Sequence, residues 1–245
     1  MHNYSPPKNL LEDRVILVTG ATRGIGRAVA ADCARHRATV LLHGRDEKAL
    51  QSLYEELREL GPEPAVAQLD LERAQGPAYQ QLIDEIEKRY GRLDGLVHNA
   101  AILGERSPIE YYDIGVWQRV MHINVNAGFI LTRCLLPLLR ESADASVLFT
   151  SSGVGHKGRA YWGAYAVSKF AVEGMTQVLA DEMEKTSVRV NCINPGPVRT
   201  RMRAQAFPAE DPQTLRTPEE LTGAYLYLLG PDSKGVSGQR IDIRS

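Results

Sequence analysis

The stretch VILVTGATRGIGRAVA, residues 15–30, joins a run of apolar residues to a glycine-rich turn and the start of a helix. Gly20, Gly24 and Gly26 fall between the first predicted strand and the first predicted helix. Glycines let the backbone approach a pyrophosphate closely, and a helix N-terminus supplies free N–H groups and the positive end of the helix dipole. The stretch therefore predicts the dinucleotide-binding turn of a Rossmann-type fold. A tight turn without a ligand is the alternative, which the position directly after the first strand disfavours.

Short apolar runs alternate with longer helical patterns along the rest of the chain. Strands are predicted at 14–18, 38–43, 64–69, 93–98, 145–150, 188–193 and 239–243. Helices are predicted at 24–36, 46–60, 77–90, 114–140 with an interruption near Pro137, and 163–184. This alternation requires crossover connections, so helices cover both faces of a parallel sheet. It predicts an α/β fold, a doubly wound Rossmann-type three-layer sandwich with a mainly parallel seven-stranded sheet.

The alternation continues without a low-complexity linker or a break in composition, so residues 1–245 are predicted to form a single NAD(P)-binding domain. Its one long irregular stretch is 197–217, which is rich in proline and arginine. Loops of this length inside a compact domain are more often functional than accidental. We therefore expect 197–217 to act as a substrate loop.

Composition excludes several classes of function. The formal net charge is −1, whereas a nucleic-acid-binding surface usually carries a basic stripe. Neither a secretory signal nor an apolar run of about 18 residues is found, so no membrane association is expected. The cysteines, Cys33, Cys134 and Cys192, are far apart and form neither a disulfide framework nor a metal-ligand cluster. The sequence therefore predicts a cytoplasmic protein without a metal site.

The end of the second predicted strand indicates which dinucleotide fits. A site that prefers NAD usually places an acid there against the ribose 2′-hydroxyl, whereas an arginine suits a 2′-phosphate. Here Gly44 stands in the expected place of the acid and Arg45 follows, while Arg23 in the glycine loop can approach the same corner. Two guanidiniums can hold a phosphate through forked hydrogen bonds. We therefore predict NADP(H) as the preferred cofactor, with NAD(H) possible; the alternative is that both arginines are solvated and Asp46 only caps the next helix.

Four motifs in order resemble those of the short-chain dehydrogenase/reductase family, compact single-domain branch. They are TGATRGIG (19–26), HNAA (98–101), TSS (150–152) with YAVSK (165–169), and NPGPVRT (194–200). The likeness extends from about residue 10 to the C-terminus. Within the family, the chain most resembles a bacterial branch, the YciK-type oxidoreductases. It implies a seven-stranded Rossmann-type sheet, hydride transfer with a nicotinamide cofactor, and a homodimer or homotetramer. Ala101 departs from the family pattern, which usually has glycine there.

The resemblance implies the site residues. The catalytic set is Asn124, Ser152, Tyr165 and Lys169, with Asn126 as the alternative to Asn124. Ser152 would donate a hydrogen bond to the substrate oxygen, and Asn124 would hold a water that links Lys169 to solvent. The cofactor-binding set is Gly20, Thr22, Arg23, Gly24, Ile25, Gly26, Gly44, Arg45, Asp70, Leu71, Asn99, Ala100, Tyr165, Lys169, Pro195, Gly196, Val198 and Thr200.

The spacing of Tyr165 and Lys169 suits acid–base chemistry. Spacing alone is weak evidence, because Tyr4 and Lys8 share it across two prolines that forbid a regular helix. Hydride transfer to a carbonyl leaves an oxyanion that needs a proton, and a phenol has an ordinary pKa of about 10. Lowering that pKa to about 7 takes about 4 kcal/mol, which an ammonium about 4 Å away supplies at an effective dielectric of about 20. Positions i and i+4 of a helix meet this distance, so we expect the pair to suffice without other groups.

Together these features predict an NADP(H)-dependent oxidoreductase that transfers a hydride between the nicotinamide and a small carbonyl or alcohol substrate. The alternative is a catalytically silent NADP(H)-binding sensor or scaffold protein, since a fold does not guarantee activity. The expected pocket walls are Leu103, Val154, His156, Tyr161, Trp162 and the part of the loop that carries Met202 and Phe207. Arg199, Arg201 and Arg203 would suit an anionic substrate, although solvated loop charges are the favoured interpretation.

Overall fold

A seven-stranded parallel sheet forms the centre of the computed structural model, which describes residues 4–243. The strands run in the order β3-β2-β1-β4-β5-β6-β7, and every pair is parallel. Their bounds are β1 Val15–Thr19, β2 Thr39–Gly44, β3 Ala65–Gln68, β4 Gly95–His98, β5 Ala145–Thr150, β6 Val188–Asn194 and β7 Arg240–Asp242. The predicted α/β class is confirmed, and the sheet is parallel throughout.

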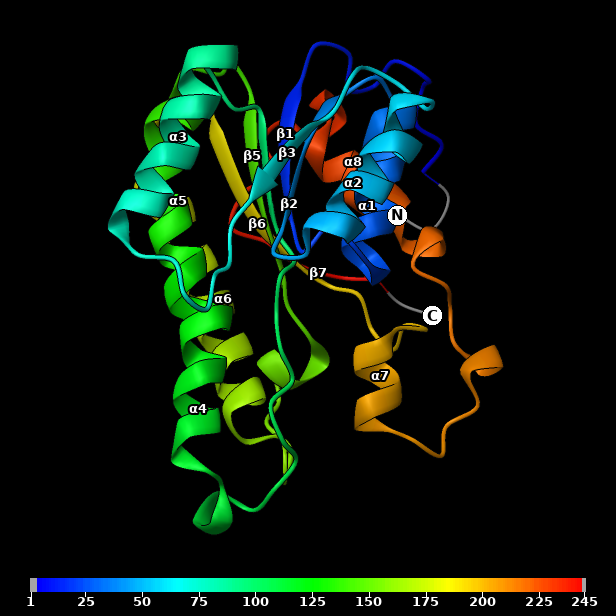
Figure 1. The fold of residues 1–245 in the computed structure, drawn as a ribbon, viewed down its shortest axis with the longest axis vertical. Helices are drawn as coiled ribbons and strands as arrows, with labels where there is room; N and C mark the ends of the chain where they lie inside the picture. The colour runs from blue at the N-terminus through cyan, green and yellow to red at the C-terminus, as the bar shows by residue number, and fades with distance from the viewer. Residues whose placement is uncertain (1–3, 244–245) are drawn as a thin grey trace.

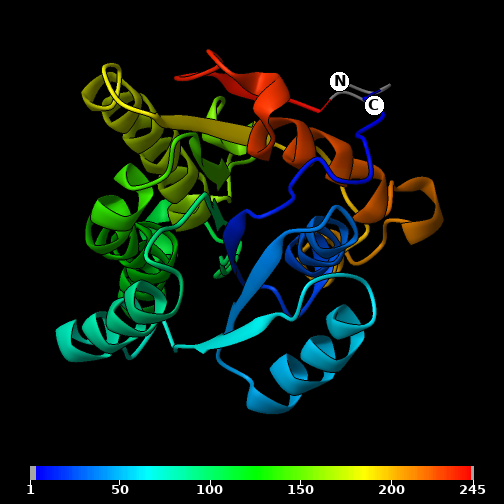
Figure 2. The same cartoon turned by 90° about the horizontal axis from the view of Figure 1, so that it is seen from above.

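Helices cover both faces of the sheet, as Figures 1 and 2 show. Their bounds are α1 Gly24–Arg35, α2 Glu47–Arg58, α3 Gly76–Tyr90, α4 Ile114–Met121, α5 Ala127–Arg140, α6 Gly163–Glu182, α7 Arg201–Ala206 and α8 Thr222–Leu229. Buried side chains of α1, α2 and α8 form one core cluster with the sheet, and those of α3, α5 and α6 form the other. Short 3-10 turns lie at Ile109–Tyr111, Gly153–Gly155, Pro212–Thr214, Glu219–Leu221 and Pro231–Ser233.

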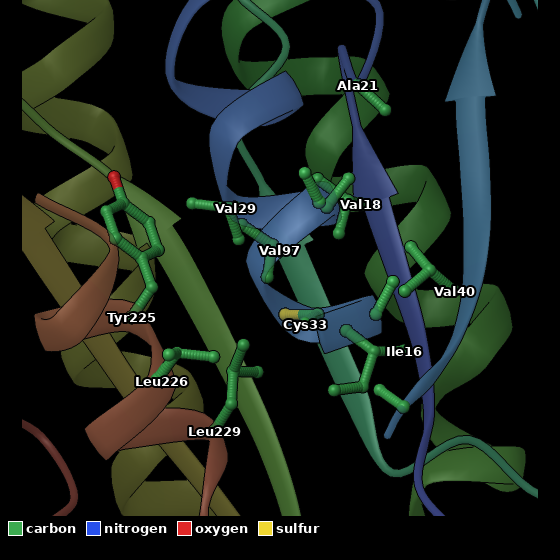
Figure 3. Packing of buried hydrophobic residues seen from close by; sticks show 14 of the residues in the cluster. Ile16, Val18, Ala21, Val29, Cys33, Val40, Val97, Tyr225, Leu226 and Leu229 are labelled. Carbon is green, nitrogen blue, oxygen red and sulfur yellow. The ribbon is translucent and has the colours of Figure 1, made fainter. Parts of the chain in front are cut away.

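The interior strand β1 explains why the sequence has continuous apolar runs rather than alternating ones. Ile16 and Val18 face the α1 and α8 side, in one cluster with Val29, Val97 and Leu226 (Figure 3), whereas Leu17 faces the opposite cluster. All five residues of β1 are therefore buried. Each buried side chain of this size contributes about 1.5–3 kcal/mol of hydrophobic free energy, so both helix layers are held to the sheet.

The strand order reverses between β1 and β4, and this reversal positions the site. The chain moves from β1 outward to β2 and β3, then returns to place β4 on the other side of β1. In open parallel sheets, ligands bind beyond the carboxyl ends of the strands at such a switch point. Gly20 follows β1 and Asn99 follows β4, so both lie there.

The predicted interruption of the helix through 114–140 is corrected by the structure. The helix through 114–140 does not break at Pro137, which lies inside α5. Leu131, Leu135 and Leu139 are fully buried in the core, and this packing outweighs the hydrogen bond that proline cannot donate. The irregularity lies instead at a π-helical turn, His122–Asn126, between α4 and α5.

The C-terminal third holds helices that periodicity did not predict. The substrate loop 197–217, expected to be irregular, contains α7, whose first turn is capped by the Thr200 hydroxyl accepting from the Arg203 N–H at 3.2 Å. Helix α8 was not predicted. It buries Ala224, Tyr225 and Leu226 on several sides, so its sequence lacks the alternation of polar and apolar residues that marks an amphipathic helix.

One helical segment passes a length and composition test for a membrane span. Ile114–Arg140 is 27 residues long and sufficiently apolar, counting α4, the π-helical turn and α5 together. Its residues Leu131, Leu135 and Leu139 nevertheless lie in the core cluster under the sheet. A core helix of an α/β domain meets the same test, so the segment is weak evidence for a span.

Candidate active site

A network around Thr19 joins the ends of β1 and β4 beneath the glycine loop. The Thr19 hydroxyl accepts the backbone N–H groups of Asn99 and Ala100, at 2.9 and 3.0 Å, and donates to the carbonyl of Val97 at 3.1 Å. The Asn99 amide donates to the carbonyls of Thr19 at 3.2 Å and Gly20 at 3.4 Å. Asn99 and Ala100 were predicted; Thr19 was not, and its place at the last position of β1 was the available signal.

The glycine loop closes tightly against this network. Gly20 and Gly24 have left-handed φ angles of 64° and 55°. A Cβ on Gly20 would lie 3.0 Å from the Ala100 Cα, and one on Gly26 would overlap the Gly20 carbonyl and the Asn99 amide. Arg23 is the N-cap of α1, a 12-residue helix, and its side chain caps none of the first-turn N–H groups. Those N–H groups therefore face the glycine loop. A close backbone and an uncapped helix N-terminus are what a pyrophosphate requires.

Other predicted cofactor residues gather round the same loop. A Cβ on Gly44 would lie 3.1 Å from Thr22, and one on Gly24 would lie 3.4 Å from Thr200, so β2 and the loop after β6 both reach the cradle. Gly196 takes a left-handed φ of 70°. Of the remaining predicted members, Ile25 lies in the first turn of α1. The others lie in the segments that follow β3 and β6: Asp70, Leu71, Pro195 and Val198.

The corner beside β2 is basic and lacks a strand-end acid. Arg45 is exposed and its Nη1 lies 3.5 Å from Glu72 Oε2, while Arg23 is also exposed. Glu72 is held more tightly by Arg119, at 2.7 and 2.8 Å, and this contact lowers the pKa of Glu72. Asp46 caps α2 by accepting from the Ala49 N–H at 3.1 Å. Arg45 can therefore turn to an incoming phosphate without leaving Glu72 unpaired.

The catalytic candidates lie between α6 and the end of β5. Tyr165 and Lys169 are buried one turn apart on α6, and the Lys169 ammonium donates to the Thr150 carbonyl at 2.7 Å. The Ser152 hydroxyl lies near enough to the Tyr165 phenol to act on its pKa, which it lowers. The neighbouring Ser151 instead donates to Glu173 at 2.6 Å. The structure thus places the second serine, not the first, beside the phenol.

Burial governs the pKa values of this pair. Burial raises the pKa of Tyr165 to about 12, against the opposing effect of Ser152. Burial lowers the pKa of Lys169 to about 8. The expectation that the lysine alone brings the phenol near neutrality is therefore wrong for the protein by itself. The Lys169 Nζ is 5.6 Å from the centroid of the Tyr165 ring and is bonded to Thr150, and desolvation of a phenolate exceeds the attraction left at that distance.

Asn124 lies in the π-helical turn and ties three elements together. Its Oδ1 accepts the Ile102 N–H at 2.8 Å, and its Nδ2 donates to the Ile102 carbonyl at 2.9 Å and to the Ser168 hydroxyl at 3.0 Å. Ser168 precedes Lys169 on α6, so Asn124 fixes the loop after β4 against α6. Asn126, the alternative candidate, is exposed.

A cavity of about 20 Å³ adjoins the lysine, and Asn124, Thr150, Lys169 and His98 are among its lining residues. This is room for about one water molecule. His98 was not predicted. Its Nε2 lies 2.7 Å from the Thr132 hydroxyl, which itself donates to the Gly128 carbonyl, so Nε2 must be the donor to Thr132. Burial lowers the pKa of His98 to about 3, so the ring is neutral and its Nδ1 is an acceptor.

An apolar wall surrounds Tyr165 on the substrate side. Of the predicted wall residues, the members that pack into one cluster with Tyr165 are Leu103, Val154, Trp162, Met202 and Phe207. His156 and Tyr161 are exposed and do not join it.

Two loop arginines have structural partners, which corrects their interpretation as solvated charges. The Arg199 side chain donates to the carbonyls of Pro212 at 2.8 Å and Leu215 at 3.2 Å. The Arg203 guanidinium forms a forked ion pair with Glu210, with both hydrogen bonds at 2.6 Å. These contacts give the substrate loop internal order.

Comparison with known proteins identifies the class. A family profile described as short chain dehydrogenase matches residues 14–211, and the chain belongs to that family. The Escherichia coli (strain K12) oxidoreductase YciK is 52% identical over 243 residues, which cover 99% of this chain and 96% of that protein. The predicted family, its YciK-like branch and the fold are thereby confirmed.

Two similar solved structures hold a nicotinamide cofactor. A short chain dehydrogenase from Escherichia coli CFT073, complexed with NADPH, has a TM-score of 0.95 and 52% identity, covering 98% of this chain and 100% of that one. One from Shigella flexneri 2a strain 301, complexed with NADP, has a TM-score of 0.94 and 52% identity, covering 96% and 99%.

The glycine cradle can be tested by adding one methyl group. In Gly26→Ala the new Cβ overlaps the Gly20 carbonyl and must open the loop, so we expect the Kd for NADPH to rise about tenfold or more, since overpacking costs about 1–3 kcal/mol. Gly76→Ala is the control, because a Cβ there meets nothing within 4 Å. Fluorescence titration measures the Kd, and thermal unfolding verifies folding. An unchanged Kd in Gly26→Ala would contradict the proposed cradle.

Proposed function

We propose that this protein is an NADP(H)-dependent oxidoreductase that reduces a carbonyl compound to an alcohol, or catalyses the reverse. The observation that carries the proposal is the pairing of the buried Tyr165 and Lys169 with the half-buried Ser152 beyond the carboxyl end of β5, at the same edge of the sheet as the glycine loop. When bound, the nicotinamide cofactor supplies a hydride to the carbonyl carbon and is itself oxidised. The protein must supply the proton that the resulting oxyanion takes up.

Tyr165 is the proposed proton donor. Its raised pKa keeps the phenol protonated across the neutral range, which is the form that carbonyl reduction needs. Ser152, next to the phenol, would donate a hydrogen bond to the same oxygen and stabilise its developing charge. For alcohol oxidation the phenolate is needed instead, and the positive charge of an oxidised nicotinamide would favour it.

Lys169 and Asn124 would restore the proton. The lysine has a pKa lowered to about 8, so it exchanges protons readily near neutral pH. The cavity lined by Lys169, Asn124 and Thr150 offers a place for one water between the ammonium and the interior polar groups. A nucleotide-binding protein without turnover has no use for a buried lysine beside a buried phenol, and this favours the enzyme over a silent sensor or scaffold.

The cofactor would be held by the residues around the glycine loop. The N-terminus of α1 suits the pyrophosphate, Asp70 and Leu71 would line the adenine, and the loop after β6 would flank the nicotinamide carboxamide. NADP(H) is proposed over NAD(H) because Gly44 leaves no acid at the end of β2 and Arg45 is available beside it. The NADP- and NADPH-bound relatives support this choice. The substrate is proposed to be a small molecule rather than a nucleic acid or a membrane, and cytoplasmic location is proposed on the three free cysteines.

Arg45 should determine cofactor preference. We expect wild-type protein to bind NADPH more tightly than NADH, and Arg45→Ala to lose about tenfold or more in NADPH affinity, because a hydrogen bond to a charged group contributes about 1.5–3 kcal/mol. NADH affinity should stay unchanged. Arg58→Ala removes a comparably exposed arginine of α2 and should alter neither affinity. Equal affinities of the wild type for both cofactors in a fluorescence titration would refute the NADP assignment.

Tyr165→Phe tests the chemistry. We expect kcat for NADPH-dependent reduction to fall by about 10²-fold or more, the usual contribution of a positioned acid, while the Kd for NADPH changes little. Tyr111→Phe, at a tyrosine that is 73% exposed, is the control and should retain full activity. Turnover is followed by NADPH absorbance over a panel of aldehydes, ketones, quinones and ketoacyl thioesters. Retained turnover in Tyr165→Phe would exclude that residue as the acid.

Assembly into a homodimer or homotetramer is proposed through helices α5 and α6. Four large apolar side chains on these helices are 42–60% exposed: Phe129 of α5 and Val167, Phe170 and Val178 of α6. Exposed apolar surface is unfavourable in water, and a second copy of the chain packed on these helices would bury it. Light scattering should therefore show a dimer or tetramer, and Phe170→Arg should shift it toward monomer. A wild-type protein that scatters as a monomer at all concentrations would contradict the proposal.

A further inference from the structure

Trp162 is brought into the active site by an unfavourable backbone. Tyr161 has a left-handed φ of 72° although its side chain is 56% exposed and in no core cluster, and Gly163 has a φ of 33° with a Cβ position that the Tyr112 ring would overlap. A non-glycine residue is strained in this region, and such strain concentrates at functional sites. The result is a buried Trp162 ring centred 5.9 Å from the ring of Tyr165.

A guanidinium covers this tryptophan. Arg106, in the segment between β4 and α4, has its Cζ 5.0 Å from the Trp162 ring centroid and also 5.0 Å from the Phe207 ring centroid. Its Nη1 donates to the Ala206 carbonyl at the end of α7. No carboxylate within residues 4–243 forms an ion pair with Arg106, so aromatic faces are the main partners of its charge.

Phe207 packs against Trp162 in the apolar cluster that contains Tyr165. Its ring lies 5.8 Å from Trp162, and the Arg203 Cζ is 3.8 Å from its centroid. The hydrogen bonds that order α7, the Thr200 cap and the Arg203–Glu210 pair, lie within the substrate loop itself. Arg216 anchors the far end of the loop to the carbonyls of Pro195 and Ile243, so displacement of Phe207 requires α7 to leave the Arg106 hydrogen bond and the ring contacts. A ring of similar size and shape would then fill the same place.

We propose that this site takes aromatic carbonyl compounds, with the substrate ring replacing Phe207 against Trp162 and under Arg106. The proposal rests on the proposed function and names the substrate class for the same site. The carbonyl group of a bound aryl ketone or aldehyde then points to Tyr165 and Ser152. An aromatic face attracts a cation and stacks on indole, and a saturated ring of the same size does neither, so the pocket discriminates by electronic character rather than volume.

A matched pair of ketones tests this selectivity. Acetophenone and cyclohexyl methyl ketone are similar in size and differ in aromaticity. We expect kcat/KM for acetophenone to be about tenfold higher, the factor that a partly buried cation–π contact with stacking provides. Arg106→Gln and Trp162→Leu should each reduce this ratio toward one, chiefly by lowering kcat/KM for acetophenone. Arg89→Gln, which removes a guanidinium 5.2 Å from the Tyr90 ring at the end of α3, is the control and should leave the ratio unchanged.

A binding measurement separates failure of the inference from failure of the proposed function. In a Trp117→Phe background, Trp162 is the only tryptophan, and we expect acetophenone to quench its fluorescence at concentrations at least tenfold below cyclohexyl methyl ketone. Selective quenching that Arg106→Gln removes, without turnover of either ketone, would support the aryl subsite and count against the oxidoreductase. Equal kcat/KM and equal quenching would overturn the subsite while leaving the proposed function intact. Preference for 4-acetylcyclohexanecarboxylate over acetophenone would show that Arg106 binds an anion, and would overturn it too.

Discussion

The hydrogen bond from the Lys169 ammonium to the Thr150 carbonyl is the interaction on which the site depends. It fixes α6 against the end of β5 and satisfies a cation that is only 4% exposed. Burying an ammonium without a hydrogen-bond partner would cost free energy. The position of α6 along β5 is therefore the one in which the Thr150 carbonyl meets the Lys169 ammonium. That position places Tyr165 one turn earlier, beside Ser152. The position of the phenol therefore follows from the hydrogen bond that solvates the ammonium.

Two closures at the carboxyl edge complete the cleft. On the cofactor side, Thr19 and Asn99 join β1 to β4, and Gly26 lets α1 begin against them. On the substrate side, Arg106 connects the segment after β4 to the end of α7. The first closure contains no room for a side chain and is rigid, as a constant cofactor allows. The second depends on ring contacts and one hydrogen bond, which constrain it less than direct backbone contact.

Much of the fold followed from local pattern, because buried parallel strands are continuous apolar runs and amphipathic helices repeat every three to four residues. Helix α8 was not predicted because it is apolar on several sides and shows no amphipathic pattern. Helix α7 was not predicted because its six residues are ordered by the Thr200 cap and the Arg203–Glu210 pair rather than by a periodic pattern. Within the site, the spacing of the glycines and of Tyr165 and Lys169 along the sequence was sufficient to predict them. Thr19, His98 and Arg106 were not, since their roles come from partners distant in sequence.

By itself, the sequence determined the order of the elements, the phosphate cradle and the identity of the phenol–amine pair, because each depends on residues close together along the chain. Only the tertiary structure decided the protonation of that pair and the shape of the substrate side. Burial raises the pKa of Tyr165 to about 12 and lowers that of Lys169 to about 8, and burial is created by elements far apart in sequence. The same holds for Arg106, which meets Trp162 and Phe207 only because three separate segments converge at one edge of the sheet.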